Sequence, residues 1–296
     1  YFILASICVP VFVMISGVTT LWSPCARGQV ITPRKTWQRI QPLLLPVLFW
    51  SAAYNIGING HYTLQDALHT LWAPTGLVHL WFIYMLVGLY LLSPLVQAIA
   101  TSRPELLHYL LLLWVVFGLF SHVVIPWFNA DPSRTFGIFH GDVINFLGYY
   151  VAGYVLMQRP PLKKSIAGLC LAGGFLISYA ITFIDNVYLM PAPHGFNFPH
   201  LNFVSPGIAL EAIGAFSLLR HISWHPRWLT PVSALVIGVY FIHEMILQYM
   251  RIHLNWVGYP YAAWWFIPAQ TISVLLLALA MAWALARLQG KRRIFF

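Results

Sequence analysis

The stretch YFILASICVPVFVMISGVTTLW, residues 1–22, contains no charged side chain. An α-helix needs about 20 consecutive apolar residues to cross the hydrocarbon core of a bilayer, so this stretch predicts a membrane-spanning helix. Of all 296 residues, 60% are hydrophobic and only 8% are charged, whereas a soluble domain carries about 25% charged residues. The apolar runs are continuous, which favours helices. We therefore expect an all-α polytopic bundle, with residues 1–296 forming a single integral-membrane domain.

About nine stretches of the chain are apolar enough to be candidate spans. The predicted spans are 1–22, 38–57, 78–99, 105–126, 143–159, 165–184, 201–219, 229–250 and 260–286. The segment TLQDALHTLW, residues 63–72, is short and amphipathic, so we expect it to lie at the membrane interface. The sequence shows no internal repeat.

The distribution of Lys and Arg predicts the orientation, because these residues concentrate in cytoplasmic loops. With residue 1 outside, fourteen of the 16 Lys and Arg residues fall on the cytoplasmic side, and only Arg134 and Arg251 fall outside. The C-terminus is then cytoplasmic, and the net charge of +9 is explained by topology. Nucleic-acid binding would need a basic face on a soluble module, so no nucleic-acid partner is expected.

Ionisable side chains within a span are candidates for function. Glu211 lies in the predicted seventh span, and His243 with Glu244 lies in the eighth. A hydrogen bond to a neighbouring helix explains Glu211 equally well, and a buried His is often only a packing residue. Adjacent residues point about 100° apart on a helix, so His243 and Glu244 need not face one site.

His79 and Trp81 stand at the outer entrance of the third span, where Trp is also typical of the interfacial belt. The outer loops hold five further histidines: His61, His69, His140, His194 and His200. Neither these histidines nor the three cysteines Cys8, Cys25 and Cys170 show the spacing of a metal site, so no metal is expected and the cysteines are assigned to packing.

A basic cluster, Arg34, Lys35 and Arg39, opens the second span. One interpretation is positive-inside anchoring with contact to lipid phosphates. The other is a binding site for a polyanionic ligand, since the guanidinium fork suits phosphate oxygens.

Four blocks of sequence occur in the following order along the chain: VPVFVMISG (9–17), RIQPLLLPVLFW (39–50), HLWFIYMLVGLYLLSPL (79–95) and IGVYFIHEMIL (237–247). Together they resemble the acyltransferase-3 family of integral-membrane O-acyltransferases, in particular its enterobacterial common antigen O-acetyltransferase branch. The resemblance covers essentially the whole chain.

This resemblance implies an enzyme of the bacterial inner membrane with about ten spans. It would take an acyl group, usually acetyl, from cytoplasmic acetyl-CoA and deliver it to a hydroxyl of a glycan or lipid-linked sugar outside, without a permanently bound cofactor. Arg34, Lys35 and Arg39 would hold the CoA phosphates, and His79 with Trp81 would line the acceptor entrance.

Two features of this chain differ from the family's pattern. The family's common pattern is Arg-x-x-Arg, whereas here four residues separate Arg34 from Arg39, and Lys35 follows Arg34 directly. Which two of these cations match the family's pair is left open. The family's first helix carries a His taken as the catalytic base, and we expect that helix to precede residue 1. Within the chain, His79, His243 and Glu211 are the weaker catalytic candidates.

Two other classes of protein remain open on the residues alone. A transporter or flippase for a small anion or lipid-linked sugar would use Glu211 and His243 as a proton relay, although transporters often show inverted repeats. A structural membrane subunit is the third alternative, and the intramembrane Glu211 and His243 count against it.

Overall fold

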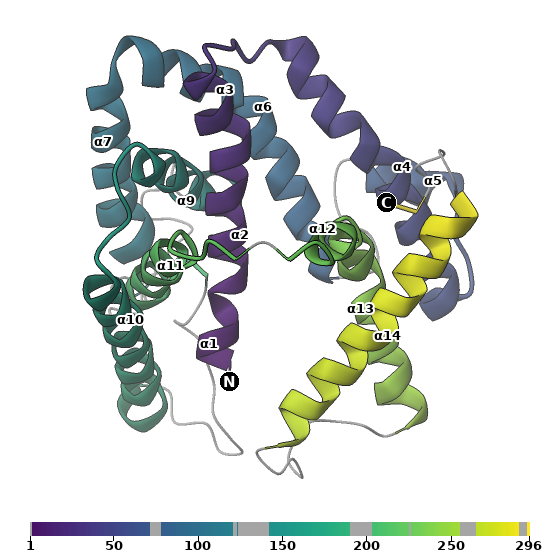
Figure 1. Ribbon diagram of the computed structural model, residues 1–296. Helices are drawn as coiled ribbons and strands as arrows, with labels where there is room; N and C mark the ends of the chain where they lie inside the picture. The colour runs from purple at the N-terminus through teal and green to yellow at the C-terminus, as the bar shows by residue number, and fades with distance from the viewer. Residues whose placement is uncertain are drawn as a thin grey trace. The chain divides into compact units, whose positions relative to one another are not determined.

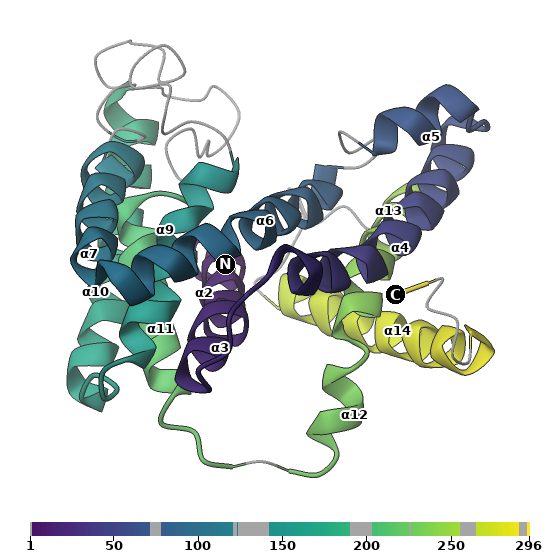
Figure 2. The same cartoon turned by 90° about the horizontal axis from the view of Figure 1, so that it is seen from above.

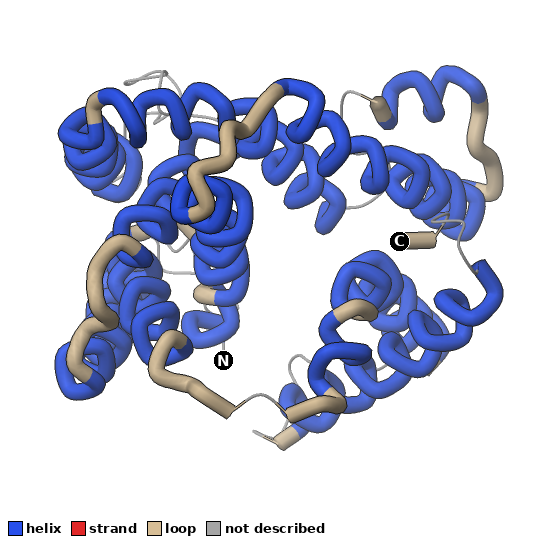
Figure 3. Tube along the Cα trace, turned by 45° about the horizontal axis from the view of Figure 1, so that its top comes forward, coloured by secondary structure: helices blue, strands red, loops and turns tan. Residues whose placement is uncertain are grey.

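The computed structural model describes residues 2–71, 78–120, 123, 142–189, 203–224, 226–254, 265–289 and 295–296 (Figure 1). Every secondary-structure element within these ranges is a helix, as the colouring of Figure 3 shows. The chain forms two compact units. The first contains Tyr1–Thr36 and Met85–Ser223, and the second contains Trp37–Tyr84 and Trp224–Phe296.

The α-helices keep the labels of Figure 1. They are α1 (Phe2–Ser6), α2 (Cys8–Gly17), α3 (Ser23–Ala26), α4 (Pro33–Asn59), α5 (Leu64–Thr70), α6 (Trp81–Ser102), α7 (Pro104–Leu113), α9 (Asp142–Met157), α10 (Lys164–Ile184), α11 (Pro206–Leu219), α12 (Leu229–Ser233), α13 (Val236–His253) and α14 (Phe266–Gln289). Three π-helical segments extend them: η1 (Val18–Trp22), η3 (Trp114–Phe120) and η6 (Asp185–Leu189), and a short 3₁₀ turn, η2 (Val78–Leu80), precedes α6.

Within the described residues, the predicted spans largely coincide with helices, and the all-α prediction is confirmed there. Parts of the predicted spans 105–126, 201–219 and 260–286 lie outside the described residues. Four helical segments there are long and apolar enough to cross a membrane: Phe2–Ala26, Trp81–Ser102, Lys164–Tyr188 and Phe266–Leu288. Three more are apolar but shorter: Pro104–Phe120, Asp142–Met157 and Pro206–Leu219. The chain is therefore a multi-pass membrane protein by length and composition of its helices.

The helix bounds differ from the predicted spans at two places. The expected span 229–250 is divided into α12 and α13, because the backbone turns at Ala234–Leu235, where the Leu235 N–H bonds the Val232 carbonyl. The second predicted span began at residue 38, but α4 begins at Pro33. Pro is suited to a first helical position, and the Thr32 hydroxyl accepts a hydrogen bond from the Lys35 N–H. The predicted interfacial segment 63–72 forms the short helix α5.

The first unit is held together by close approach of helix backbones. Gly17 of α2 lies against the backbone carbonyl of Tyr150 in α9, and Gly153 of α9 lies against the carbonyl of Met14. A Cβ at either glycine would collide with that backbone. Small residues that allow such an approach are the usual means of helix packing in membranes. Helices α10 and α11 are likewise adjacent, as both Figure 1 and Figure 2 show.

In the first unit, side chains near the ends of helices form hydrogen bonds to the backbone of neighbouring loops. The Gln97 side chain, near the end of α6, accepts from the Ile31 N–H and donates to the Gln29 carbonyl. The Arg220 guanidinium, after α11, donates to the carbonyls of Leu156 and Arg159. These loops were all predicted to be cytoplasmic, and their side of the membrane stays a prediction.

In the second unit, α4 packs on α13 through aromatic rings. Trp50 stacks on Phe241, with ring centroids 6.2 Å apart and planes 6° apart, and its indole N–H donates to the Phe295 carbonyl. Trp50 and Phe241 are buried. Helices α13 and α14 also contact each other. The stacked rings therefore hold α4 against α13.

Candidate active site

The basic cluster lies on the first two turns of α4, not in a loop before it. Arg34 and Lys35 are exposed, and Arg39 is half-buried. Lys35 and Arg39 are four residues apart, which places them on one face of a helix, whereas Arg34 and Arg39 are separated by about 140°. The Lys35 ammonium donates to the Val30 carbonyl. The helix therefore favours Lys35 with Arg39 as the pair that shares a face.

The N-terminus of α4 adds to the positive potential of this region. The first N–H groups of a helix have no partner within the helix, and the helix dipole is positive at that end. Helix N-termini bind phosphate for this reason. Three cations on the first turns of α4 make its N-terminal end suited to a polyanion.

His79 and His243, which are far apart in sequence, are brought together in the second unit. Their ring centroids are 5.3 Å apart, with the rings edge to face. Tyr54 and Tyr240 flank His79, each with its ring centroid 5.5 Å from that of His79. His79 comes from η2, His243 and Tyr240 from α13, and Tyr54 from α4. The sequence named both histidines but gave no reason to pair them.

The hydrogen bonds of His243 determine which of its nitrogens is free. Nδ1 lies 2.7 Å from the Tyr240 carbonyl oxygen and 3.2 Å from that of Val239. A carbonyl only accepts, so Nδ1 carries the proton and Nε2 of a neutral ring holds a lone pair. This arrangement is suited to accepting a proton at Nε2.

His79 has an unusual environment for a polar ring. Both of its ring nitrogens are buried and have no hydrogen-bond partner among the described residues. Its backbone carbonyl accepts from the Tyr240 hydroxyl at 2.6 Å. Buried polar atoms are nearly always paired, so an unpaired imidazole indicates a place for a water or a substrate hydroxyl.

Tyr54 makes a contact that the sequence did not reveal. Its hydroxyl donates to the Phe241 carbonyl at 2.6 Å and accepts from the Met245 N–H at 3.1 Å. Those two backbone groups are four residues apart and bond directly in a regular α-helix. The hydroxyl therefore bridges the turn of α13 that contains His243, and Tyr54 positions that imidazole.

Tyr54 and Tyr240 are the residues of this site that sequence reasoning missed. Tyr240 stands three residues before His243, which is a spacing that puts both on one helix face, and this signal was available. Tyr54 lies in an apolar run and looks like a lipid-facing or core ring until its partner on α13 is known.

The other sequence candidates make different contacts. Glu211 belongs to the first unit, where it is fully buried and accepts from the Ser178 hydroxyl at 3.1 Å. Trp81 begins α6, with its ring 6.1 Å from that of Phe82. Glu244 accepts from the Gln248 amide, whereas His243 bonds backbone carbonyls of its own helix.

Two of the five histidines predicted for the outer loops are among the described residues. His61 is exposed before α5, and His69 is exposed in its last turn. His140, His194 and His200 lie outside the described residues. Across the residues that the structure describes, no three His, Cys, Asp or Glu side chains are grouped so as to hold a metal ion.

Comparison with protein families gives a match over nearly the whole chain. The acyltransferase-3 family, described as an acyltransferase domain, matches residues 1–287. Comparisons with curated proteins and with solved structures gave no match. The family match agrees with the resemblance of the four sequence blocks, and the chain therefore belongs to the acyltransferase-3 family and is an acyltransferase.

Proposed function

We propose that the protein transfers an acetyl group from cytoplasmic acetyl-CoA to a hydroxyl of a cell-surface glycan or lipid-linked sugar. Its place would be the bacterial inner membrane, with the C-terminus cytoplasmic. The match of the acyltransferase family over residues 1–287 carries the proposal of acyl transfer. The acetyl donor and the glycan acceptor rest on the resemblance to the enterobacterial common antigen O-acetyltransferase branch.

The N-terminal end of α4 is the proposed donor site. CoA carries several phosphate charges, and Arg34, Lys35 and Arg39 supply cations on the first two turns of this helix. Charge-assisted hydrogen bonds to phosphate are about twice as strong as neutral ones. The proposal takes Lys35 and Arg39 as one phosphate clamp, because they share a helix face, and Arg34 as a separate contact.

His243 is the proposed proton acceptor among the residues of this chain. Nε2 would take the proton of the acceptor hydroxyl as its oxygen attacks the thioester carbonyl. The new C–O bond forms, the C–S bond breaks, and the proton passes from the imidazolium to the departing CoA thiolate. The unpaired nitrogens of His79 would hold the acceptor through one of its hydroxyls.

The two proposed sites lie far apart along α4. Arg39 and Tyr54, which contacts the turn of His243, are separated by 15 residues, or about 22 Å along a helix of 1.5 Å rise per residue. CoA is a long molecule with its phosphates at one end and its thiol at the other. Binding at the start of α4 is therefore compatible with a thioester that reaches well into the helix bundle.

The donor proposal is tested with acetyl-CoA kinetics. Lys35→Ala and Arg39→Ala should each raise KM for acetyl-CoA, since hydrogen bonds to charged groups contribute about 1.5–3 kcal/mol. Arg251→Ala, which removes an exposed cation from the C-terminal part of α13, is the matched control and should leave KM unchanged. Equal KM in all of these variants would refute the donor site and support membrane anchoring by the cluster.

The proton acceptor is tested separately. His243→Gln should lower kcat with KM for acetyl-CoA unchanged, whereas His253→Gln, an exposed His on the same helix, should retain kcat. Retained kcat in His243→Gln, with the protein folded, would assign the base to a residue outside this pair.

A further inference from the structure

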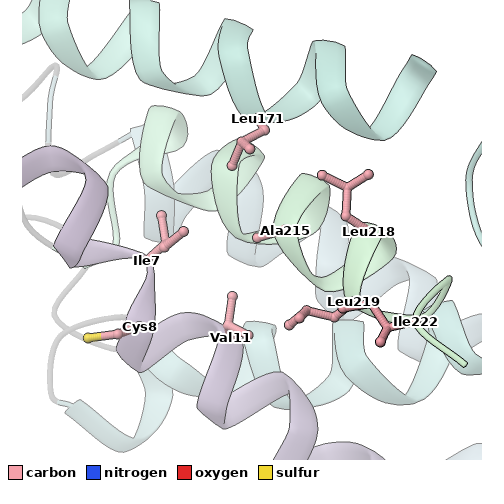
Figure 4. Close-up of a pocket in the computed structure, with 8 residues that line it drawn as sticks. All are labelled: Ile7, Cys8, Val11, Leu171, Ala215, Leu218, Leu219 and Ile222. Atoms are coloured by element: carbon pink, nitrogen blue, oxygen red, sulfur yellow. The ribbon is translucent and has the colours of Figure 1, made fainter. Parts of the chain in front are cut away.

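An apolar groove lies in the first unit (Figure 4). It has a volume of about 560 Å³. Figure 4 shows side chains from α2, α10 and α11 around it. The lining residues are Ile7, Cys8, Val11, Leu171, Ala215, Leu218, Leu219 and Ile222. Apart from the Cys8 thiol, every lining side chain is a hydrocarbon, so the groove suits a flexible apolar chain.

The groove leads to a basic end of the unit. Helices α10 and α11 are antiparallel, because Gly174 of α10 meets Gly207 of α11 while Gly214 of α11 meets Ala167 of α10. The end of α11 therefore lies beside the start of α10. The imidazole of His221 confirms this, since its Nε2 lies 2.7 Å from the Leu162 carbonyl oxygen.

Exposed cations are concentrated at that end. Lys163 and Lys164 precede and begin α10, and both are exposed. Lys164 is seven residues before Leu171, so the two share a face of α10 about 10 Å apart along its axis. The sequence has no Asp or Glu from residue 143 to 184 or from 212 to 243. The apolar groove thus ends near an uncompensated positive charge.

The physical chemistry of a membrane decides which part of a ligand gives selectivity. An acyl chain gains little by leaving the bilayer for a groove, because lipid tails are as apolar as Leu side chains. Close packing still favours filling the groove with some chain. A negative head group beside lysines gains more, since each Lys or Arg near an anionic lipid surface contributes about 1 kcal/mol.

We propose that this groove binds one acyl chain of an anionic phospholipid, with the lipid phosphate beside Lys163 and Lys164. The groove shares no residue with the proposed acetyl-CoA and histidine sites, and this proposal does not depend on the proposed function. The bound lipid would join α2 to the α10–α11 pair, so it would stabilise the first unit.

The head-group part is tested by lipid binding to the purified full chain in detergent. Phosphatidylglycerol and phosphatidylcholine with identical acyl chains are titrated, and native mass spectrometry measures the bound fraction. Phosphatidylglycerol should bind more tightly, and Lys163→Gln and Lys164→Gln should each weaken it about fivefold, the equivalent of 1 kcal/mol. Arg103→Gln, an exposed cation paired with Glu105 at the α6–α7 turn, is the control and should leave binding unchanged. Equal binding of the two lipids would overturn the proposal.

The groove part needs its own measurement. Ala215→Trp should fill the groove and abolish the preference for phosphatidylglycerol while the lysines remain. In the unaltered protein, phosphatidylglycerol should slow alkylation of the exposed Cys8 by a maleimide, and Cys25 and Cys170, which do not line the groove, are internal references. This second measurement applies even if Ala215→Trp does not fold. An alkylation rate of Cys8 that phosphatidylglycerol does not change would place the lipid elsewhere and refute the groove.

Discussion

Removal of the Tyr54 hydroxyl tests the structural basis of the histidine site. In Tyr54→Phe, the Phe241 carbonyl loses its donor and the Met245 N–H loses its acceptor. A net hydrogen bond contributes about 0.5–1.5 kcal/mol to stability, and such bonds between membrane helices average about 0.6 kcal/mol. Two bonds together therefore set an upper value of about 3 kcal/mol.

The backbone of α13 limits this loss. Phe241 and Met245 are in the i, i+4 relation of a continuous helix, so their backbone groups can bond to each other without the hydroxyl. The variant then loses the two bonds to the side chain but keeps a backbone bond, and the expected net loss is about 1 kcal/mol. The hydroxyl also ties α4 to the turn that carries His243, so kcat should fall while KM for acetyl-CoA stays the same. That kinetic result rests on the proposed function.

The measurement combines unfolding and kinetics on the purified protein. Tyr249→Phe is the matched control, because Tyr249 is on the same helix, is 60% exposed, and makes no hydroxyl hydrogen bond among the described residues. Tyr54→Phe should melt lower than Tyr249→Phe by a few degrees. Equal melting of the two variants would refute the bridge. A loss well above 3 kcal/mol would show that the variant leaves both backbone groups unpaired.

Three further outcomes follow from other parts of the molecule. Gly174→Ala should destabilise the first unit by about 1–3 kcal/mol, since its Cβ would meet backbone atoms of α11, whereas Gly168→Ala on the same helix has open space and should be neutral in the same unfolding assay. At the start of α5, hydrogen bonds from the hydroxyl and N–H of Thr63 hold the pKa of Asp66 below its ordinary value of 3.8. The stability that this cap gives the helix is present above that value and is lost as pH falls through the lowered pKa, which faster amide exchange in α5 at low pH would reveal. Reporter fusions placed after residues 30, 162, 224 and 294 should all report a cytoplasmic location. An external signal from any one of them would refute the predicted orientation.

The positions of the helices were predictable because an apolar run of sufficient length marks a span by itself. Residues 143–159 were the shortest predicted span, and the structure has α9 there at Asp142–Met157. The start of α4 was misplaced because polar residues can continue a helix beyond its apolar part. The division between α12 and α13 was missed because hydropathy does not change at Ala234, where only the backbone turns.

The candidate site was predictable in its residue types and not in its geometry. His79 and His243 stood out as polar residues at or within apolar runs. Their contact joins η2 to α13 across 164 positions of the chain, and no local pattern encodes that distance. The contact of Tyr54 with the site could not be predicted for a related reason. Its ring fits any apolar run, and the contact depends on where its hydroxyl meets another helix.

Glu211 shows how surroundings separate two residues that the sequence treats alike. The rule that an intramembrane ionisable residue is functional applied equally to Glu211 and His243. His243 keeps a lone pair at Nε2, but Glu211 is fully buried between the backbones of α10 and α11, where a Cβ on Gly174 would lie 2.7 Å from the Glu211 Cγ. The Glu211 Cγ is therefore packed too closely against α10 for a substrate to lie between them. Glu211→Gln, which still accepts from Ser178, should therefore retain kcat per folded molecule, while Glu211→Leu should lower stability by about 1–3 kcal/mol because it leaves the Ser178 hydroxyl without this acceptor. Melting temperature and specific activity measured on the same preparations test this prediction, and a loss of kcat in Glu211→Gln with an unchanged melting temperature would assign Glu211 to the acyl path.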